Sequence, residues 1–296
     1  MRILNCQIFI FRDALFTGGP AINCRRAFRN SAVRSKVLGV QMARLWAFAS
    51  AIEIAFALAT IPATGVHSKL NFRNKMKRDK IIFMSLIRAF NWFTKITAWP
   101  IYNLLSRPKY YYEDKKIQNR KIKGGAIIVS NHTALFDYPV FMFTFCCRTL
   151  RYQMAEVLFE KKVLGWLLKR LGAIYVDRRT FDFSFIKVSE DILKNGGVVG
   201  IFPESRLPRP QEERPLPFKP SFAYVAFSSG APLIPCFTNG SYFSKKRTRV
   251  IIGKPLYPQD YFDKTKTKKE NMAELSKVVR EKIIELGKLL DEQCKK

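Results

Sequence analysis

The chain has 296 residues, enough for one large domain or for one domain with an appendage. Hydrophobic residues make up 48% of it and aromatic residues 14%, a composition that excludes a mostly disordered protein. The formal net charge of +29 predicts an anionic partner, namely phospholipid headgroups, nucleic acid or an acidic carrier protein. Nucleic acid is the weakest of the three, since we find no zinc-finger, RNA-binding-sheet or helix-turn-helix pattern.

The six cysteines have neither the spacing of a disulfide framework nor that of a metal site. This usage is typical of a reducing compartment, and it predicts a location facing the cytosol. We therefore predict no metal ion.

Residues 1–75 form a basic N-terminal extension that contains only two acidic residues, Asp13 and Glu53. Glu53 lies at the centre of the apolar run from Leu45 to Ile61, where a carboxylate costs about 3 kcal/mol on membrane insertion scales. Three interpretations stay open: a targeting leader, a transmembrane segment, or an upstream stretch before a true start at Met76.

Residues 76–110 form a second segment, in which aromatic residues such as Trp92 and Trp99 alternate with Arg88 and Lys95. This composition is typical of a helix that lies in a membrane interface, with its rings at headgroup level and its basic groups near anionic lipid. The alternative is a helix that packs on its own domain.

Residues 111–296 alternate strand-like and helical patterns and form the predicted catalytic domain. The expected strands are Ala126–Val129, Ala173–Val176, Val198–Phe202, Pro232–Phe237 and Val250–Ile252. The expected helices are Met154–Leu171, Asp182–Lys194, Pro220–Ser229 and Lys268–Glu292. The order predicts an α/β fold with a largely parallel or mixed sheet flanked by helices and preceded by the membrane-docking helix.

The stretch Ser130–Asp137, which reads Ser-Asn-His-Thr-Ala-Leu-Phe-Asp, follows the first expected strand. His132 therefore falls just past the carboxyl end of that strand, where open α/β sheets bind ligands. Asp137 follows five residues later and can reach an imidazole nitrogen, fixing the tautomer and leaving the other nitrogen free to accept a proton. The alternative is an ordinary hydrogen-bonded His–Asp pair without catalytic function.

Two further expected strands end in charged groups. One leads into Asp177-Arg178-Arg179 and the other into Phe202-Pro203-Glu204-Ser205-Arg206. Because these ends meet at one edge of the sheet, they predict a pocket with a base and several guanidinium groups, which suit phosphate recognition. Taken singly, Arg178 and Arg206 could also be solvated or ion-paired loop residues.

These blocks resemble those of the glycerolipid acyltransferase family, which includes 1-acyl-sn-glycerol-3-phosphate and other lysophospholipid acyltransferases. The resemblance covers roughly residues 124–240: Asn131-His132 with Asp137, Tyr175-Val176-Asp177-Arg178, Phe202-Pro203-Glu204-Ser205-Arg206, and Ala231-Pro232-Leu233-Ile234-Pro235. The third block departs from the family pattern, with Ser205 where glycine is usual and one residue fewer before Arg206. Lys219-Pro220-Ser221 also stands where the family often has a glycine. These departures bear on the acceptor more than on the reaction.

The resemblance implies acyl transfer from a thioester to a lipid hydroxyl, with His132 as the base and Asp137 as its partner. The substrate-binding residues that it implies are Asn131, Thr133, Arg178, Pro203, Glu204, Ser205 and Arg206. Arg178 and Arg206 would hold the acceptor phosphate, Glu204 would orient hydroxyls or an arginine, and backbone amides near Ser205 would stabilise the oxyanion. No acyl-enzyme is needed, and the chain has no Gly-x-Ser-x-Gly elbow. The proline-rich loop Arg206–Pro220 is either a flap beside the site or a plain surface connection.

The sequence thus predicts an acyltransferase that converts 1-acylglycerol 3-phosphate and an acyl thioester into phosphatidate at the cytoplasmic face of a membrane. No cofactor is expected beyond the co-substrate, acyl coenzyme A or acyl carrier protein. The predicted partners are this donor, the lysophospholipid acceptor and the phospholipid surface. One alternative is another lysophospholipid or a glycolipid as acceptor, and a second is a non-catalytic lipid- or nucleic-acid-binding protein. The length of the acyl chain and the oligomeric state stay open.

Overall fold

The computed structural model describes residues 69–295 except 181, 210 and 243–245. The predicted extension before residue 69, including its apolar run, lies outside the described residues. The rest divides into two compact units, and residues 88–160 and 165–295 belong to the unit that holds the sheet. The other unit includes the described residues 69–87 and 161–164.

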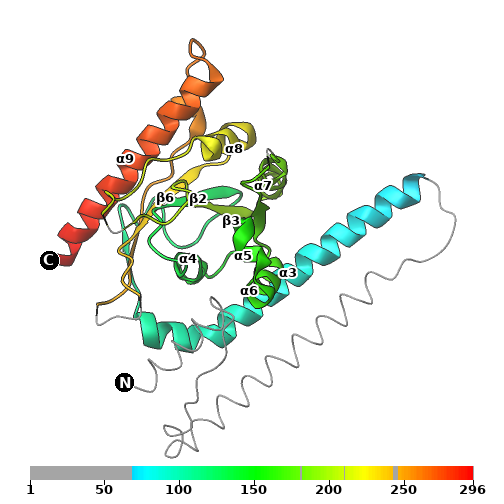
Figure 1. The fold of residues 1–296 in the computed structure, drawn as a ribbon, viewed down its shortest axis with the longest axis horizontal. Coiled ribbons are helices and arrows are strands. Elements are labelled where there is room, and N and C mark those ends of the chain that lie inside the picture. The colour runs from blue at the N-terminus through cyan, green and yellow to red at the C-terminus, as the bar shows by residue number, and fades with distance from the viewer. Residues whose placement is uncertain (1–68, 181, 210, 243–245, 296) are drawn as a thin grey trace, which may run out of the picture. The chain divides into compact units, whose positions relative to one another are not determined.

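The sheet has seven strands in the order β1-β7-β6-β2-β5-β3-β4 (Figure 1). The strands are β1 Lys109–Tyr112, β2 Ala126–Ser130, β3 Leu150–Ala155, β4 Ile174–Val176, β5 Val198–Ile201, β6 Leu233–Thr238 and β7 Arg249–Ile252. Neighbouring strands are parallel except β6 and β7, which are antiparallel. The predicted α/β fold with a mixed, largely parallel sheet is therefore confirmed.

The central strand β2 is apolar because both of its faces are covered, as is usual for strands inside a parallel sheet. Its Ile127 pairs with Val199 of β5 on one side and with Leu233 of β6 on the other. Since β5 and β6 both pair with β2 in parallel, the carboxyl ends of the three strands lie at one edge of the sheet. The sequence motifs follow these ends, so the topology brings them to that edge.

Helices cover both faces of the sheet. The helices of the described chain are α3 Lys69–Ser106, α4 Asp137–Thr144, α5 Glu156–Glu160, α6 Lys162–Leu171, α7 Ser184–Lys194, α8 Ser221–Ser229 and α9 Lys268–Lys295, with a short 3-10 turn at Pro258–Tyr261. α7, α8 and α9 pack through their apolar residues on one face, and α4 lies on the other (Figure 1). α8 ends at Gly230, whose φ of 67° is the left-handed conformation that glycine adopts without strain.

The predicted helix over 154–171 is wrong at its beginning, and two strands were not expected. Leu150–Ala155 forms β3, in which buried and half-buried side chains alternate because Arg151 and Gln153 lie between apolar neighbours. The helical part begins only at Glu156 and is divided into α5 and α6. Strand β1 was missed as well, because its tyrosines carry no clear alternation.

Helix α3 continues to Ser106 with Pro100 inside it. Within residues 88–106 one side packs on the sheet unit: the side chain of Asn91 donates to the carbonyl of Leu171, and the Lys95 ammonium donates to two carbonyls that follow α4. Five large apolar residues of this stretch are 54% to 72% accessible: Trp92, Ile96, Trp99, Ile101 and Leu104. Among the described residues, none of the helices combines the length and apolar composition that a membrane crossing requires.

Candidate active site

His132 lies two residues beyond the end of β2, and its neighbours fix the backbone there. The buried Asn131 side chain donates to the carbonyl of Thr238 and accepts from the amide of the same residue, both at 2.9 Å. Both ends of the Asn131 amide are thus engaged with the end of β6. This favours a positioning role for Asn131 over the substrate contact that we predicted.

The structure brings His132 and Asp137 together, as their spacing predicts. Nδ1 of His132 lies 2.7 Å from Oδ2 of Asp137, which is the first residue of α4 and has no exposed surface. The same Oδ2 accepts from the amides of Thr133 and Ala134, at 2.6 and 3.0 Å. Oδ1 accepts from the Thr133 hydroxyl at 2.7 Å and from the hydroxyl of Tyr242. Thr133 therefore serves the carboxylate and is a positioning residue in this structure.

An ionised carboxylate can only accept, so the tautomer that fits this contact has its proton on Nδ1 of His132 and its lone pair on Nε2. The ring lies flat against Phe202, with centroids 4.3 Å apart and planes 11° apart. Phe202 in turn lies beside Tyr152, whose ring passes so close to β5 that a side chain at Gly200 would overlap it. Only glycine fits at that position. Its missing side chain leaves room for the Tyr152 ring, which packs against Phe202, and Phe202 in turn supports the His132 ring.

Glu204 faces the interior of the protein. It is buried, its Oε1 accepts the backbone amide of His132 at 2.8 Å, and its Oε2 accepts that of Leu216 at 3.0 Å. Burial raises the pKa of Glu204, although these two amides act in the opposite direction. We predicted that Glu204 orients substrate hydroxyls or an arginine; in this structure each of its oxygens accepts a backbone amide, which favours a positioning role. Glu204 thus links the loop that carries His132 (the histidine loop) to the proline-rich loop Arg206–Pro220.

The neighbours of Glu204 are also turned inward. Pro203 is buried, and its carbonyl accepts the amide of Lys219. The amide of Ser205 donates to the carbonyl of Phe202 at 3.0 Å, so it is not free to stabilise an oxyanion as we predicted. Ser205 has a φ of 63°, which explains why glycine is the usual residue here in the family that the chain resembles.

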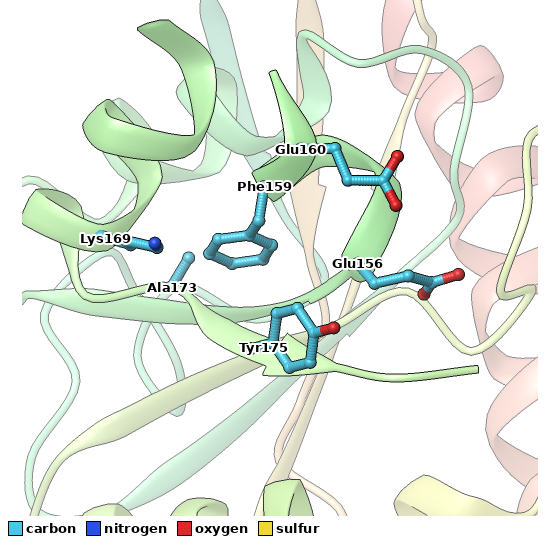
Figure 2. A pocket seen from close by; sticks show the side chains of 6 residues that line it. All are labelled: Glu156, Phe159, Glu160, Lys169, Ala173 and Tyr175. Carbon is cyan, nitrogen blue, oxygen red and sulfur yellow. The ribbon is translucent and has the colours of Figure 1, made fainter. Parts of the chain in front are cut away.

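The two adjacent arginines after β4 differ in what they contact. The Arg179 guanidinium pairs with Glu160 at 2.6 Å and with Glu156 at 3.5 Å. Figure 2 shows both carboxylates projecting from α5 beside Tyr175, in a pocket of about 410 Å³. The backbone amide of Arg178 also donates to Glu156, at 3.3 Å, whereas the Arg178 guanidinium is exposed and forms no ion pair within the described chain. Arg178 is therefore the arginine left available for an anionic ligand.

Arg206 is exposed and already has a partner. Both terminal nitrogens of its guanidinium donate to the Glu212 carboxylate at 2.6 Å. This guanidinium lowers the pKa of Glu212 to about 2, so the pair stays ionised at neutral pH. The proline-rich loop that carries both residues is anchored near Leu216 by Glu204 and by Arg280 of α9. Within the described chain, neither Arg178 nor Arg206 contacts His132 or Asp137 directly.

Sequence reasoning missed Tyr242, Thr238 and Leu216. They lie 105, 107 and 12 positions away from their hydrogen-bond partners, which are Asp137, Asn131 and Glu204 respectively. None belongs to a motif, and no local pattern marks them. Only the approach of the end of β6 to the end of β2 brings the first two to the site.

Comparison with known proteins identifies the family. A family model described as Acyltransferase matches residues 110–239. The 1-acyl-sn-glycerol-3-phosphate acyltransferase of Bacillus subtilis is 30% identical over 180 residues, which cover 59% of this chain and 87% of that protein. The protein of the same name from Borreliella burgdorferi is 25% identical over 182 residues, covering 56% and 68%. A solved structure, the 1-acyl-sn-glycerophosphate acyltransferase of Thermotoga maritima, is 17% identical with a TM-score of 0.48, covering 86% of this chain and 97% of that one.

The family model and the Bacillus subtilis relative define the class of protein as an acyl-transferring enzyme. The chain belongs to the acyltransferase family, and it is an acyltransferase.

Proposed function

We propose that the enzyme transfers a fatty acyl group from an acyl thioester to the free hydroxyl of 1-acylglycerol 3-phosphate, giving phosphatidate. The observation that carries this proposal is the 2.7 Å contact between Nδ1 of His132 and Oδ2 of Asp137 at the carboxyl edge of the sheet. The names of the two relatives support the choice of acceptor.

In this mechanism the lone pair on Nε2 of His132 accepts the proton of the acceptor hydroxyl while the hydroxyl oxygen attacks the thioester carbonyl. Asp137 keeps the ring in the required tautomer and stabilises the imidazolium that forms. When the tetrahedral intermediate collapses, the carbon–sulfur bond breaks and the imidazolium returns its proton to the leaving thiolate. The products are an ester and a free thiol, and His132 is neutral again.

The acceptor phosphate is assigned to Arg178 and Arg206. The free guanidinium of Arg178 supports the first assignment. For Arg206 the phosphate must replace Glu212, which already presents two oxygens to the guanidinium as a phosphate would. Phosphate binding at Arg206 is thus an exchange of one anion for another.

We also propose that the enzyme works at the cytoplasmic surface of a membrane, with residues 76–110 as the docking segment before a catalytic domain of residues 111–296. The five exposed apolar residues between Trp92 and Leu104 of α3 support this, because the rest of the sheet unit does not cover them. Each Lys or Arg near an anionic leaflet adds about 1 kcal/mol to the free energy of membrane binding.

Binding to anionic vesicles should weaken steeply with salt and should weaken again in Trp99→Ala. Binding that is insensitive to salt would argue against this docking mode.

One observation favours a second candidate acceptor. Arg206 is engaged with Glu212, and Ser205 replaces the usual glycine, so the phosphate site differs from the family pattern. Another lysophospholipid or a glycolipid is therefore the alternative.

The test is acyl transfer by the full chain, on anionic vesicles, from a labelled acyl thioester to lysophosphatidate. His132→Ala should abolish transfer. His67→Ala, at the other histidine of the chain, is the matched control and should retain it. Monoacylglycerol, which lacks the phosphate, should be a poor acceptor. Equal rates with both acceptors would reject the phosphate assignment, and activity in His132→Ala would reject the base.

A further inference from the structure

Tyr242 reaches the site from the loop that follows β6, and its hydroxyl donates to Oδ1 of Asp137. The Thr133 hydroxyl donates to the same oxygen at 2.7 Å. Oδ2 is left for Nδ1 of His132 and for two backbone amides. The two oxygens of Asp137 are thus divided between hydroxyl groups on one side and the imidazole on the other. Tyr242 lies three residues beyond the segment that matches the family model.

The direction of this hydrogen bond follows from the groups involved. Burial and the neighbouring Asp137 carboxylate raise the pKa of Tyr242, so its hydroxyl stays protonated. Its single proton goes to the carboxylate, which can only accept. The Thr238 hydroxyl, 3.0 Å away, must then donate its own proton to the Tyr242 oxygen. The result is a chain of donors from Thr238 through Tyr242 to Asp137, in which each bond polarises the next.

The backbone around Tyr242 is held close to the histidine loop. Gly240 has a φ of 65°, and a side chain at this position would come within 2.8 Å of the Thr133 hydroxyl oxygen. Thr238 is bound through its backbone to Asn131, the residue before His132. The end of β6 therefore holds Asn131, the following loop lies against Thr133, and the Tyr242 hydroxyl donates to Asp137 from between these two attachments.

We propose that Tyr242 is a positioning residue for acyl transfer: it holds Oδ1 of Asp137 so that Oδ2 faces Nδ1 of His132. The proposal rests on the role of His132 as the base in the proposed function. Without the hydroxyl, Asp137 keeps only the Thr133 hydroxyl on Oδ1 and can rotate. The imidazole then loses part of its orientation, and the imidazolium loses part of its stabilisation.

The first test is steady-state kinetics of Tyr242→Phe in the full chain. We expect kcat to fall about tenfold, the size expected for one hydrogen bond to a charged group, while KM for donor and acceptor changes by less than about twofold. Tyr138→Phe is the matched control. Tyr138 is buried next to Asp137 on α4, and its hydroxyl has no hydrogen-bond partner in the described chain, so kcat should not change. A normal kcat in Tyr242→Phe would overturn the proposal.

A double-mutant cycle separates positioning from general destabilisation. If Tyr242 acts through Asp137, then Tyr242→Phe should change kcat by less than about twofold when it is added to Asp137→Asn. An undiminished tenfold loss in that background would mean that Tyr242 acts elsewhere, and the proposal would fail.

A measurement without substrate distinguishes this proposal from the proposed function. The proton on Nδ1 of His132, bonded to a carboxylate, should resonate at low field in the proton NMR spectrum. We expect Tyr242→Phe to move this resonance and Tyr138→Phe to leave it in place. A moved resonance in an enzyme that gives no phosphatidate would count against the acceptor alone. A resonance that does not move would count against Tyr242.

Discussion

Asp137 is fully buried and accepts hydrogen bonds from four residues, whereas Arg206 is exposed and pairs with one carboxylate on its own loop. A buried carboxylate is costly to leave unpaired, so its surroundings must hold it in one position. An exposed ion pair contributes little and exchanges partners readily. The difference matches two tasks. Proton transfer needs fixed geometry, whereas an anionic substrate must be able to enter and leave. Changes around Asp137 should therefore act on kcat, and changes around the arginines on KM.

The largest effect is expected for Asp137→Asn. The amide has no negative charge to stabilise the imidazolium, and it can accept through only one atom, so some of the donors that now bind Oδ1 and Oδ2 lose their acceptor. We expect kcat to fall about a thousandfold with little change in KM, in the range seen for carboxylates that orient a catalytic histidine. Kinetics with a circular dichroism melting curve would check this. A loss of less than about threefold in a folded variant would show that Asp137 is structural only.

Glu204→Gln should have the next largest effect, about thirtyfold on kcat, because one of the two backbone amides loses its acceptor and the histidine loop is released. Arg280→Lys is a suitable control, because it loosens the proline-rich loop at Pro215 and Leu216 without touching His132. If both variants lose the same activity, the proline-rich loop and not the histidine backbone is responsible.

The raised pKa of Glu204 also predicts that the free energy of unfolding depends on pH. The pKa of Glu204 is raised in the folded state above its ordinary value of 4.5, so between these two pKa values the folded state binds more protons than the unfolded one. The contribution of Glu204 to the free energy of unfolding therefore falls as pH rises through this interval. Urea unfolding at several pH values should show the wild type losing stability relative to Glu204→Gln. The opposite slope would contradict a raised pKa of Glu204 in the folded state.

On the other side of the comparison, Arg178→Ala should raise KM for lysophosphatidate about tenfold and leave kcat nearly unchanged. Arg179→Ala removes the same charge from the neighbouring position but breaks only its pairs with the exposed Glu160 and, at 3.5 Å, with the buried Glu156, so a change in KM of about twofold or less is expected. The two variants should behave alike with an acceptor that has no phosphate. If Arg179→Ala had the larger effect on KM, the assignment would have to be reversed.

Glu212→Gln should have the smallest effect. It removes the anion that competes for Arg206, so KM for lysophosphatidate should fall by about twofold. The effect should disappear when Arg206 is also replaced by alanine. A higher KM in Glu212→Gln would mean that Glu212 holds Arg206 in its binding position.

The sequence by itself determined the α/β fold, the positions of β2 and β4–β7, the helices after β4 and the pairing of His132 with Asp137. These features are local. Continuous apolar runs mark buried strands, Gly230 ends a helix, and five residues of a tight turn are enough to join the histidine to its carboxylate.

Only the tertiary structure decided how the polar residues are used. Glu204 turns inward because the amide of His132, 72 positions away, lies beside it, and Tyr242 meets Asp137 across 105 positions. The sequence shows that Arg178 and Arg179 are adjacent, but their different contacts depend on where α5 places Glu156 and Glu160. A charged side chain takes whichever partner folding brings within hydrogen-bonding distance, and that partner leaves no mark in the local pattern of residues.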